Sequence, residues 1–161
     1  MRNSASGAQD RGVNVGLLVL RLGAGLSLFL FFGWQKLHDA SAYLRTGQWT
    51  FVDFNRKVGL PFPVLVAFLQ ASNESVMAVF LAASLFSRIS AACLTVGFAV
   101  ATYCSLKAAE PAWMMAAYFC LMFLVLWLAG PGSYSLDQLL SSRFAKKIAT
   151  NQLPPKTLLV P

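Results

Sequence analysis

The chain has 161 residues, of which 57% are hydrophobic and only 12% are charged, and its mean hydropathy is +0.61. So much apolar side chain cannot be buried inside one soluble domain of this size, which indicates an integral membrane protein and excludes a disordered chain or a coiled coil. The net charge of +7 comes from basic residues near the chain ends rather than from a basic patch interleaved with aromatic residues, so we expect no nucleic-acid partner.

Four apolar stretches are long enough to cross a membrane, because a spanning helix needs about 20 residues for a hydrocarbon layer of about 30 Å. They cover about residues 13–33, 64–86, 89–106 and 112–130. Ser87 and Arg88 are the break between the second and third stretches. The pattern therefore predicts an all-α fold, a four-helix transmembrane bundle with tight antiparallel hairpins.

The region between the first two stretches, residues 34–61, alternates aromatic and basic side chains. This mixture is typical of the lipid headgroup zone. It predicts one or two short interfacial helices, split at Gly47 and lying flat on the membrane. An ordered loop without helix is the alternative.

The orientation follows from the positive-inside rule. With four spans both termini lie on one side, and that side carries seven basic residues against five opposite. This predicts a multi-pass protein of the cell (cytoplasmic) membrane with both termini in the cytoplasm. We expect one transmembrane domain over residues 1–140, followed by a basic tail, residues 141–161, that contacts lipid or a partner subunit.

Arg21 and Glu74 are the ionisable residues at bilayer depth, and such residues are candidate functional sites. Counting from the span ends places both near the midplane, so we expect them to form an ion pair. One interpretation is that the pair only fixes helix register. In the other, it lines a cavity for a small lipid-soluble ligand, a quinone or a lipid headgroup, together with neighbouring polar residues: Asn73, Gln70, Gln35, Lys36 and His38.

Metal and covalent cofactor sites are not expected. A single histidine, His38, cannot build a haem or metal centre, and the three cysteines, Cys93, Cys104 and Cys120, form no CxxC motif and are expected to be buried thiols.

Small residues at helical spacing predict close packing of the second span through Ala71, Ser75, Ala78 and Ala82. The fourth stretch is followed by Gly130, Pro131 and Gly132, which stop a helix, and Tyr134 and Asp137 would lie at the membrane border.

Several of these residues, in this order, resemble the DoxX family of small four-span membrane proteins. The resemblance runs over about residues 15–140 and is carried by Arg21-Leu22, Gly33-Trp34-Gln35-Lys36-Leu37, Gly59-Leu60-Pro61, Glu74, Leu85-Phe86-Ser87-Arg88 and the stretch from Gly130 to Asp137. It implies a compact four-helix membrane bundle, with the family's intramembrane Arg and Glu at Arg21 and Glu74. The family's usual histidine before the glycine is Phe32 here, so histidine-dependent chemistry is not implied.

Members of that family are linked to quinone-coupled sulfur oxidation, to oxidant-defence complexes and to membrane chaperoning. Our first hypothesis is therefore an accessory membrane subunit of a quinone-linked oxidoreductase, with redox centres supplied by a partner and no catalysis in isolation. The alternative is a structural or assembly subunit of a larger membrane complex. A small transporter is the third hypothesis, and an independent enzyme is the least supported.

Overall fold

The computed structural model describes residues 3–130, and its regular elements there are all helical. In chain order they are α1 (Asn3–Leu28), η1 (Phe29–Gly33), α2 (Trp34–Thr46), α3 (Thr50–Val58), α4 (Pro63–Ser72), η2 (Asn73–Met77), α5 (Ala78–Ala82), α6 (Ser87–Lys107) and α7 (Trp113–Ala129). The elements written η are single π-helical turns. The predicted roles of Pro131, Gly132, Tyr134, Asp137 and the tail lie outside the described residues.

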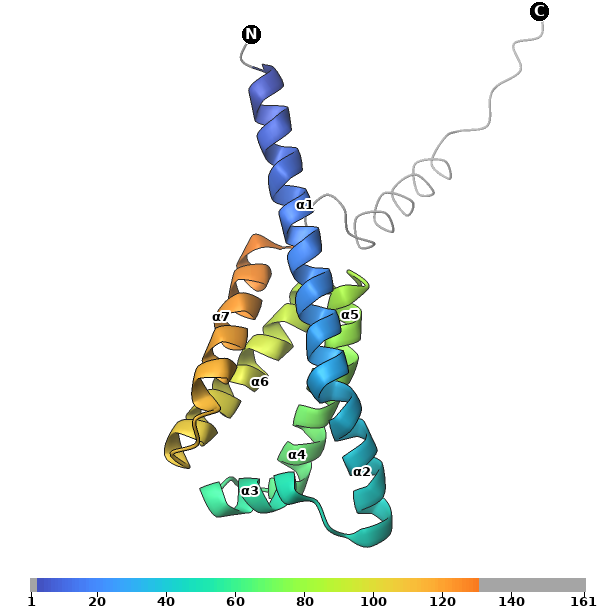
Figure 1. Ribbon diagram of the computed structural model, residues 1–161, viewed down its shortest axis with the longest axis vertical. Coiled ribbons are helices and arrows are strands. Elements are labelled where there is room, and N and C mark those ends of the chain that lie inside the picture. The colour runs from blue at the N-terminus through green and yellow to red at the C-terminus, as the bar shows by residue number, and fades with distance from the viewer. Residues whose placement is uncertain (1–2, 131–161) are drawn as a thin grey trace, which may run out of the picture.

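The first helix is longer than the apolar stretch that predicts it. α1, η1 and α2 form one rod from Asn3 to Thr46, bent but unbroken (Figure 1). The interpretation of residues 34–46 as a separate interfacial helix is therefore wrong. The end of an apolar run does not stop a helix, and the first residue here that favours a stop is Gly47, which ends α2 at φ 67°. The predicted split at Gly47 is confirmed.

α3 is the short helix predicted between the first two spans. It is bounded by Gly47 and by Gly59, which has φ 80°, and it lies across the lower end of the molecule in Figure 1. Pro63 then opens α4 at the first helical turn, where its missing N–H costs nothing.

The second rod, α4, η2 and α5, runs antiparallel to the first and packs closely against it. A Cβ atom added at Gly25 would lie 2.7 Å from the Ala78 carbonyl oxygen and 2.8 Å from the Ala82 Cβ atom. Both alanines are buried, as are Ala71 and Ser75. The predicted small-residue face of the second span is thus confirmed as the surface that meets the first helix.

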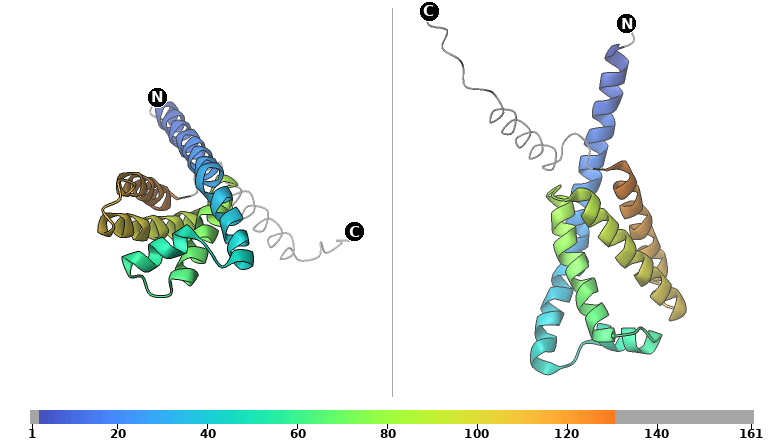
Figure 2. Two further views of the ribbon diagram at one scale, coloured as in Figure 1. Left: turned by 60° about the horizontal axis from the view of Figure 1, so that its bottom comes forward. Right: turned by 180° about the vertical axis from the view of Figure 1, so that it is seen from behind.

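α6 and α7 form an antiparallel hairpin that leans away from the other two rods. Seen from behind in Figure 2, α6 starts beside α5 at the upper end and diverges from α4 toward the lower end. Three helical rods, over residues 11–46, 63–82 and 87–107, are long and apolar enough to cross a membrane, and α7 is a shorter apolar helix. Its 17 residues correspond to about 25 Å. The all-α bundle is confirmed.

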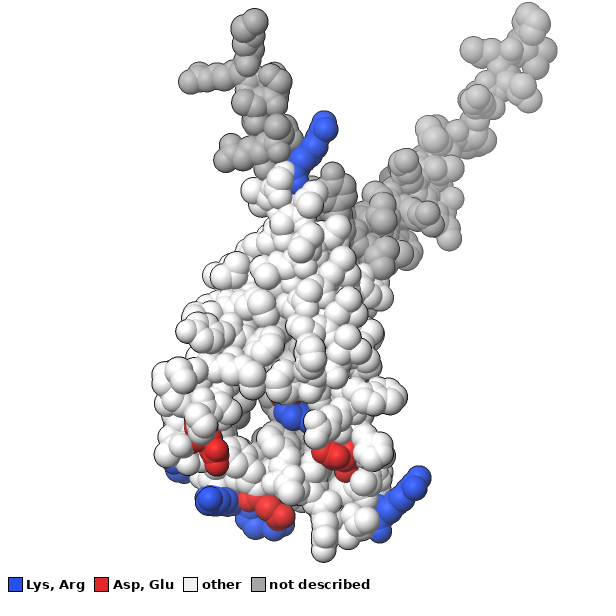
Figure 3. Space-filling view, in the orientation of Figure 1, with Lys and Arg blue, Asp and Glu red and all other residues white. Residues whose placement is uncertain are grey.

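Charged side chains gather at the lower end, over α2, α3 and the α6–α7 turn, whereas the body above them is largely uncharged (Figure 3). Large apolar residues such as Phe31, Val96 and Leu128 are exposed on that body. This distribution fits a protein whose sides face lipid. Which end faces the cytoplasm stays a prediction.

Candidate functional site

Arg21 and Glu74 do not form the predicted ion pair. The Arg21 guanidinium donates to the Ser84 hydroxyl (3.4 Å) and to the Leu17 carbonyl (3.2 Å), near the upper end. Glu74 lies at the level of Gly33, because a Cβ atom added there would be 2.6 Å from the Glu74 carbonyl oxygen. Gly33 follows Arg21 by twelve residues, or about 18 Å of helix, which is too far for contact.

The cation beside Glu74 is Lys36, one turn beyond Gly33. The Lys36 Nζ atom lies 2.6 Å from the Glu74 Oε1 atom, and the Gln70 amide donates to the same oxygen at 2.8 Å. Glu74 is only 3% exposed and the Lys36 side chain 22% exposed. A buried carboxylate is therefore satisfied by a cation from the first rod and an amide from its own helix.

The two π-helical turns meet at this point. η1 contains Gly33, η2 contains Glu74, and the two turns contact each other. The Ser75 hydroxyl also lies 3.2 Å from the Gly33 carbonyl oxygen. The two rods approach so closely here that a side chain at Gly33 would collide with the backbone of the second rod. Single π turns inside helices are frequent at functional sites, and here one of them carries the buried carboxylate.

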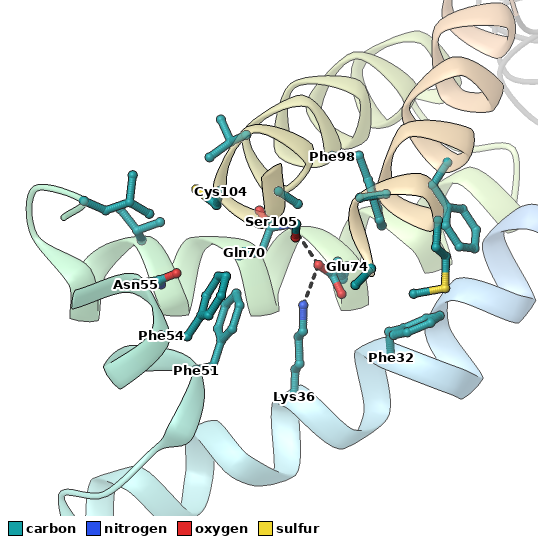
Figure 4. A pocket seen from close by; sticks show the side chains of 18 residues that line it. Phe32, Lys36, Phe51, Phe54, Asn55, Gln70, Glu74, Phe98, Cys104 and Ser105 are labelled. Atoms are coloured by element: carbon teal, nitrogen blue, oxygen red, sulfur yellow. Dashed lines mark hydrogen bonds and ion pairs between the residues drawn. The ribbon is translucent and has the colours of Figure 1, made fainter. Parts of the chain in front are cut away.

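An aromatic cavity of about 170 Å³ opens beside the ion pair, between the first two rods and the α6–α7 hairpin. Figure 4 shows Lys36 reaching from α2 to Glu74, with Gln70 next to them. Figure 3 shows the corresponding side of the molecule hollowed above its lower end. Five phenylalanines line the cavity: Phe32, Phe51, Phe54, Phe98 and Phe119.

α3 closes the lower side of this cavity. Lys36 Nζ lies 4.5 Å from the centre of the Phe51 ring, a cation–π contact, and Phe51 stacks on Phe54 with an angle of 7° between the rings. Lys107, at the end of α6, donates to the Val58 carbonyl at 2.7 Å and so caps the C-terminus of α3. The short helix is thus fixed to both neighbouring walls.

The other predicted site residues lie apart from this cavity. Asn73 is on the outer side of the same helix, where its amide donates to the Cys93 carbonyl (3.0 Å). Gln35 is exposed, and His38 is 78% exposed, so neither reaches the cavity. Gly130 ends α7 with φ 75° and lies against the Arg88 guanidinium.

The cysteines do not behave alike. Cys104 is buried and lines the cavity, whereas Cys93 is exposed on the outer surface, so its predicted burial is wrong. Within residues 3–130 no three His, Cys, Asp or Glu side chains come together as metal ligands would.

Sequence reasoning missed the contribution of α3 and of Lys107. The aromatic residues of α3 were expected at the headgroups, but its apolar side faces the cavity. A signal was present: Phe51, Phe54 and Val58 recur at helical spacing opposite Asp53, Arg56 and Lys57, which is the pattern of a helix with one buried side.

Comparison with known proteins gives one family. The DoxX family model matches residues 16–107, which include Arg21, Gly33, Lys36 and Glu74. No curated protein and no solved structure matches the chain.

Proposed function

Since the chain belongs to the DoxX family of membrane proteins, we propose that it is an accessory membrane subunit of a quinone-linked oxidoreductase and that it binds the ring of a quinone beside Lys36 and Glu74. The observation that carries this proposal is the aromatic cavity with one buried ion pair in its wall. Largely apolar pockets with a few placed polar groups are typical of ligand sites.

The size of the cavity supports a single-ring ligand. Its volume of about 170 Å³ is close to that of an engineered cavity of about 150 Å³ that holds one benzene ring. The surrounding phenylalanines offer ring faces and edges for stacking. A drug-sized ligand, which needs about 300 Å³ or more, would not fit inside.

The polar wall supports a ligand with acceptor oxygens. An ammonium group carries three N–H donors, and Lys36 directs one of them at Glu74. The remaining donors are available to a quinone carbonyl at the cavity wall. Because Glu74 neutralises the lysine charge, the site stays compatible with an uncharged, lipid-soluble molecule.

The test is calorimetric titration of a tailless benzoquinone into the full chain in lipid nanodiscs. We expect saturable binding. Glu74→Gln should weaken it at least about tenfold, because a neutral side chain at this position holds the Lys36 ammonium group less firmly. Glu110→Gln is the matched control, because Glu110 is exposed and lies outside the cavity lining. A second comparison uses Lys36→Met, which removes the cavity lysine, with Lys57→Met at an exposed position as its control.

The structural-subunit hypothesis predicts a different result. In that case the benzoquinone binds no more tightly to the wild type than to the Glu74→Gln variant, and the electron-transfer rate of a partner complex does not depend on either cavity residue. That outcome would overturn the proposal.

A further inference from the structure

A second hollow lies directly behind the cavity. It is a groove of about 710 Å³ between α4 and α6, and it shares three lining residues with the cavity: Val66, Gln70 and Val100. Two apolar side chains of the groove, Leu69 and Val96, are 61% and 65% exposed, so the groove opens on the outer surface of the helices. In a membrane protein that surface faces lipid.

Gln70 is the polar residue of the partition between the two spaces, beside Val66 and Val100. Its Nε2 atom lies 2.8 Å from Glu74 Oε1, on the cavity side, and 3.5 Å from the carbonyl oxygen of Gly97 on α6. The second contact is at the limit of hydrogen bonding, so the link to α6 is the weaker one. The Gln70 side chain is therefore able to leave α6 while keeping Glu74.

Gly97 provides the space in which this partition sits. A Cβ atom added there would lie 3.2 Å from Gln70 Oε1 and would collide with the Asn73 amide. Because Gly97 has no side chain, two amide side chains of the second rod reach the backbone of α6: Gln70 at Gly97 and Asn73 at Cys93. The contact between the rods at this level thus includes two hydrogen bonds from side-chain amides.

We infer that the quinone enters from the bilayer between α4 and α6, with Gln70 as a lateral gate, and that its apolar tail stays in the groove. This inference rests on the proposed function. The cavity takes a ring but no long tail, so the tail must leave it. The groove is an apolar path that adjoins the cavity at Gln70, beside the ion pair, whereas the lower side is closed by α3 and leads to charged residues. The ligand class is therefore a long-tailed lipid quinone.

The experiment compares two probes with one ring, a tailless benzoquinone and the same ring with a decyl tail, in nanodiscs that contain the full chain. Ala92→Phe places a bulky ring in the groove without touching the cavity lining. Ala99→Phe is the matched control on the same helix, exposed and outside both hollows.

Relative to Ala99→Phe, we expect Ala92→Phe to weaken binding of the tailed probe at least about tenfold. This is the effect of losing the burial of two methylene groups. The tailless probe should bind equally to both variants. If both variants bind the tailed probe alike, this inference is overturned and the proposed function stands. If neither probe binds the wild type, this inference and the proposed function are both overturned.

Kinetics test the gate independently of the groove variants. Stopped-flow measurements on Gln70→Ala should show association and dissociation of the tailed probe both faster by about fivefold, the factor that corresponds to one neutral hydrogen bond. Rates equal to those of the wild type would overturn the role of Gln70 as a gate.

Discussion

The first and second rods bury one charged side chain in their upper half, Arg21, and one in their lower half, Glu74, but the surroundings of the two differ. Arg21 is 1% exposed and Glu74 is 3% exposed. Around the upper charge the rods touch through Gly25, Ala78 and Ala82, and Arg21 does not line the aromatic cavity. Around the lower charge both rods carry π turns and the cavity opens.

This comparison separates the two interpretations of an intramembrane charge. Burial is common to both residues and therefore does not identify a site. Among residues 3–130 the difference is the adjacent space, since Glu74 combines a cavity wall, an aromatic lining and an amide at the boundary with lipid, whereas Arg21 does not line that cavity. The proposed function places the ligand at the Lys36–Glu74 pair, and on that proposal Arg21, which joins α1 to the α5–α6 turn through Ser84, fixes helix register.

The largest expected effect comes from breaking the lower pair. Lys36→Met leaves the buried Glu74 carboxylate without its cation, and loss of one partner of a buried ion pair costs about 3–5 kcal/mol. The unfolding midpoint in mild detergent should fall accordingly. Lys57→Met, at an exposed position, should leave it unchanged.

The double variant Lys36→Met with Glu74→Leu sharpens this result. It removes both charges, so we expect it to recover most of the stability that Lys36→Met loses, while quinone binding stays absent. A double variant as unstable as Lys36→Met would contradict the assignment of the pair.

The next largest effect compares two close helix contacts. Added Cβ atoms would lie 2.7 Å from the Ala78 carbonyl oxygen at Gly25 and 2.6 Å from the Glu74 carbonyl oxygen at Gly33. Gly25→Ala and Gly33→Ala should each cost about 1–3 kcal/mol, the range for overpacking. Gly16→Ala is the control, because an added Cβ there meets nothing within 4 Å.

Ligand binding should distinguish the same two variants. Gly33→Ala displaces the backbone that carries Glu74, so we expect weaker benzoquinone binding by titration. Gly25→Ala lies at the upper contact and should retain wild-type affinity. Equal losses of affinity would show that the two halves are not independent.

The helical stretches were predictable because hydrophobicity and chain breaks determine them directly. The second, third and fourth spans, predicted at 64–86, 89–106 and 112–130, agree closely with Pro63–Ala82, Ser87–Lys107 and Trp113–Ala129. Lys36 and Glu74 were also candidates, as polar residues in or beside apolar stretches. Their partners were not predictable in the same way.

The error in pairing Arg21 with Glu74 has a physical cause. The ends of an apolar run define membrane depth only where the helix ends with the run, but the first helix continues through residues 34–46. Its register against the second rod is set by close contacts at Gly25 and Gly33, which are specific to the tertiary structure. The π turns add a local change of helical phase that no hydropathy pattern contains.

A smaller effect is expected at the lower side of the cavity. Lys107→Met removes the cap on the Val58 carbonyl, which is worth about 1–2 kcal/mol for a charged donor at a helix C-terminus. The loss should be local, so hydrogen exchange should accelerate in α3 and not in α5. Lys107→Arg, which keeps a cationic donor, should restore much of the protection, and uniform exchange across the molecule would contradict a local role.

The smallest effect belongs to the outer side of α3. Arg56 and Asp53 form an ion pair of 2.8 Å, but their side chains are 65% and 67% exposed. Exposed pairs contribute little, so Arg56→Gln should lower the unfolding midpoint by less than about 2 °C. A decrease as large as that caused by Lys107→Met would mean that the outer side of α3 is covered in the membrane, by headgroups or by a partner subunit. In that case exposure in the isolated chain would no longer predict what a charge contributes at this end of the molecule.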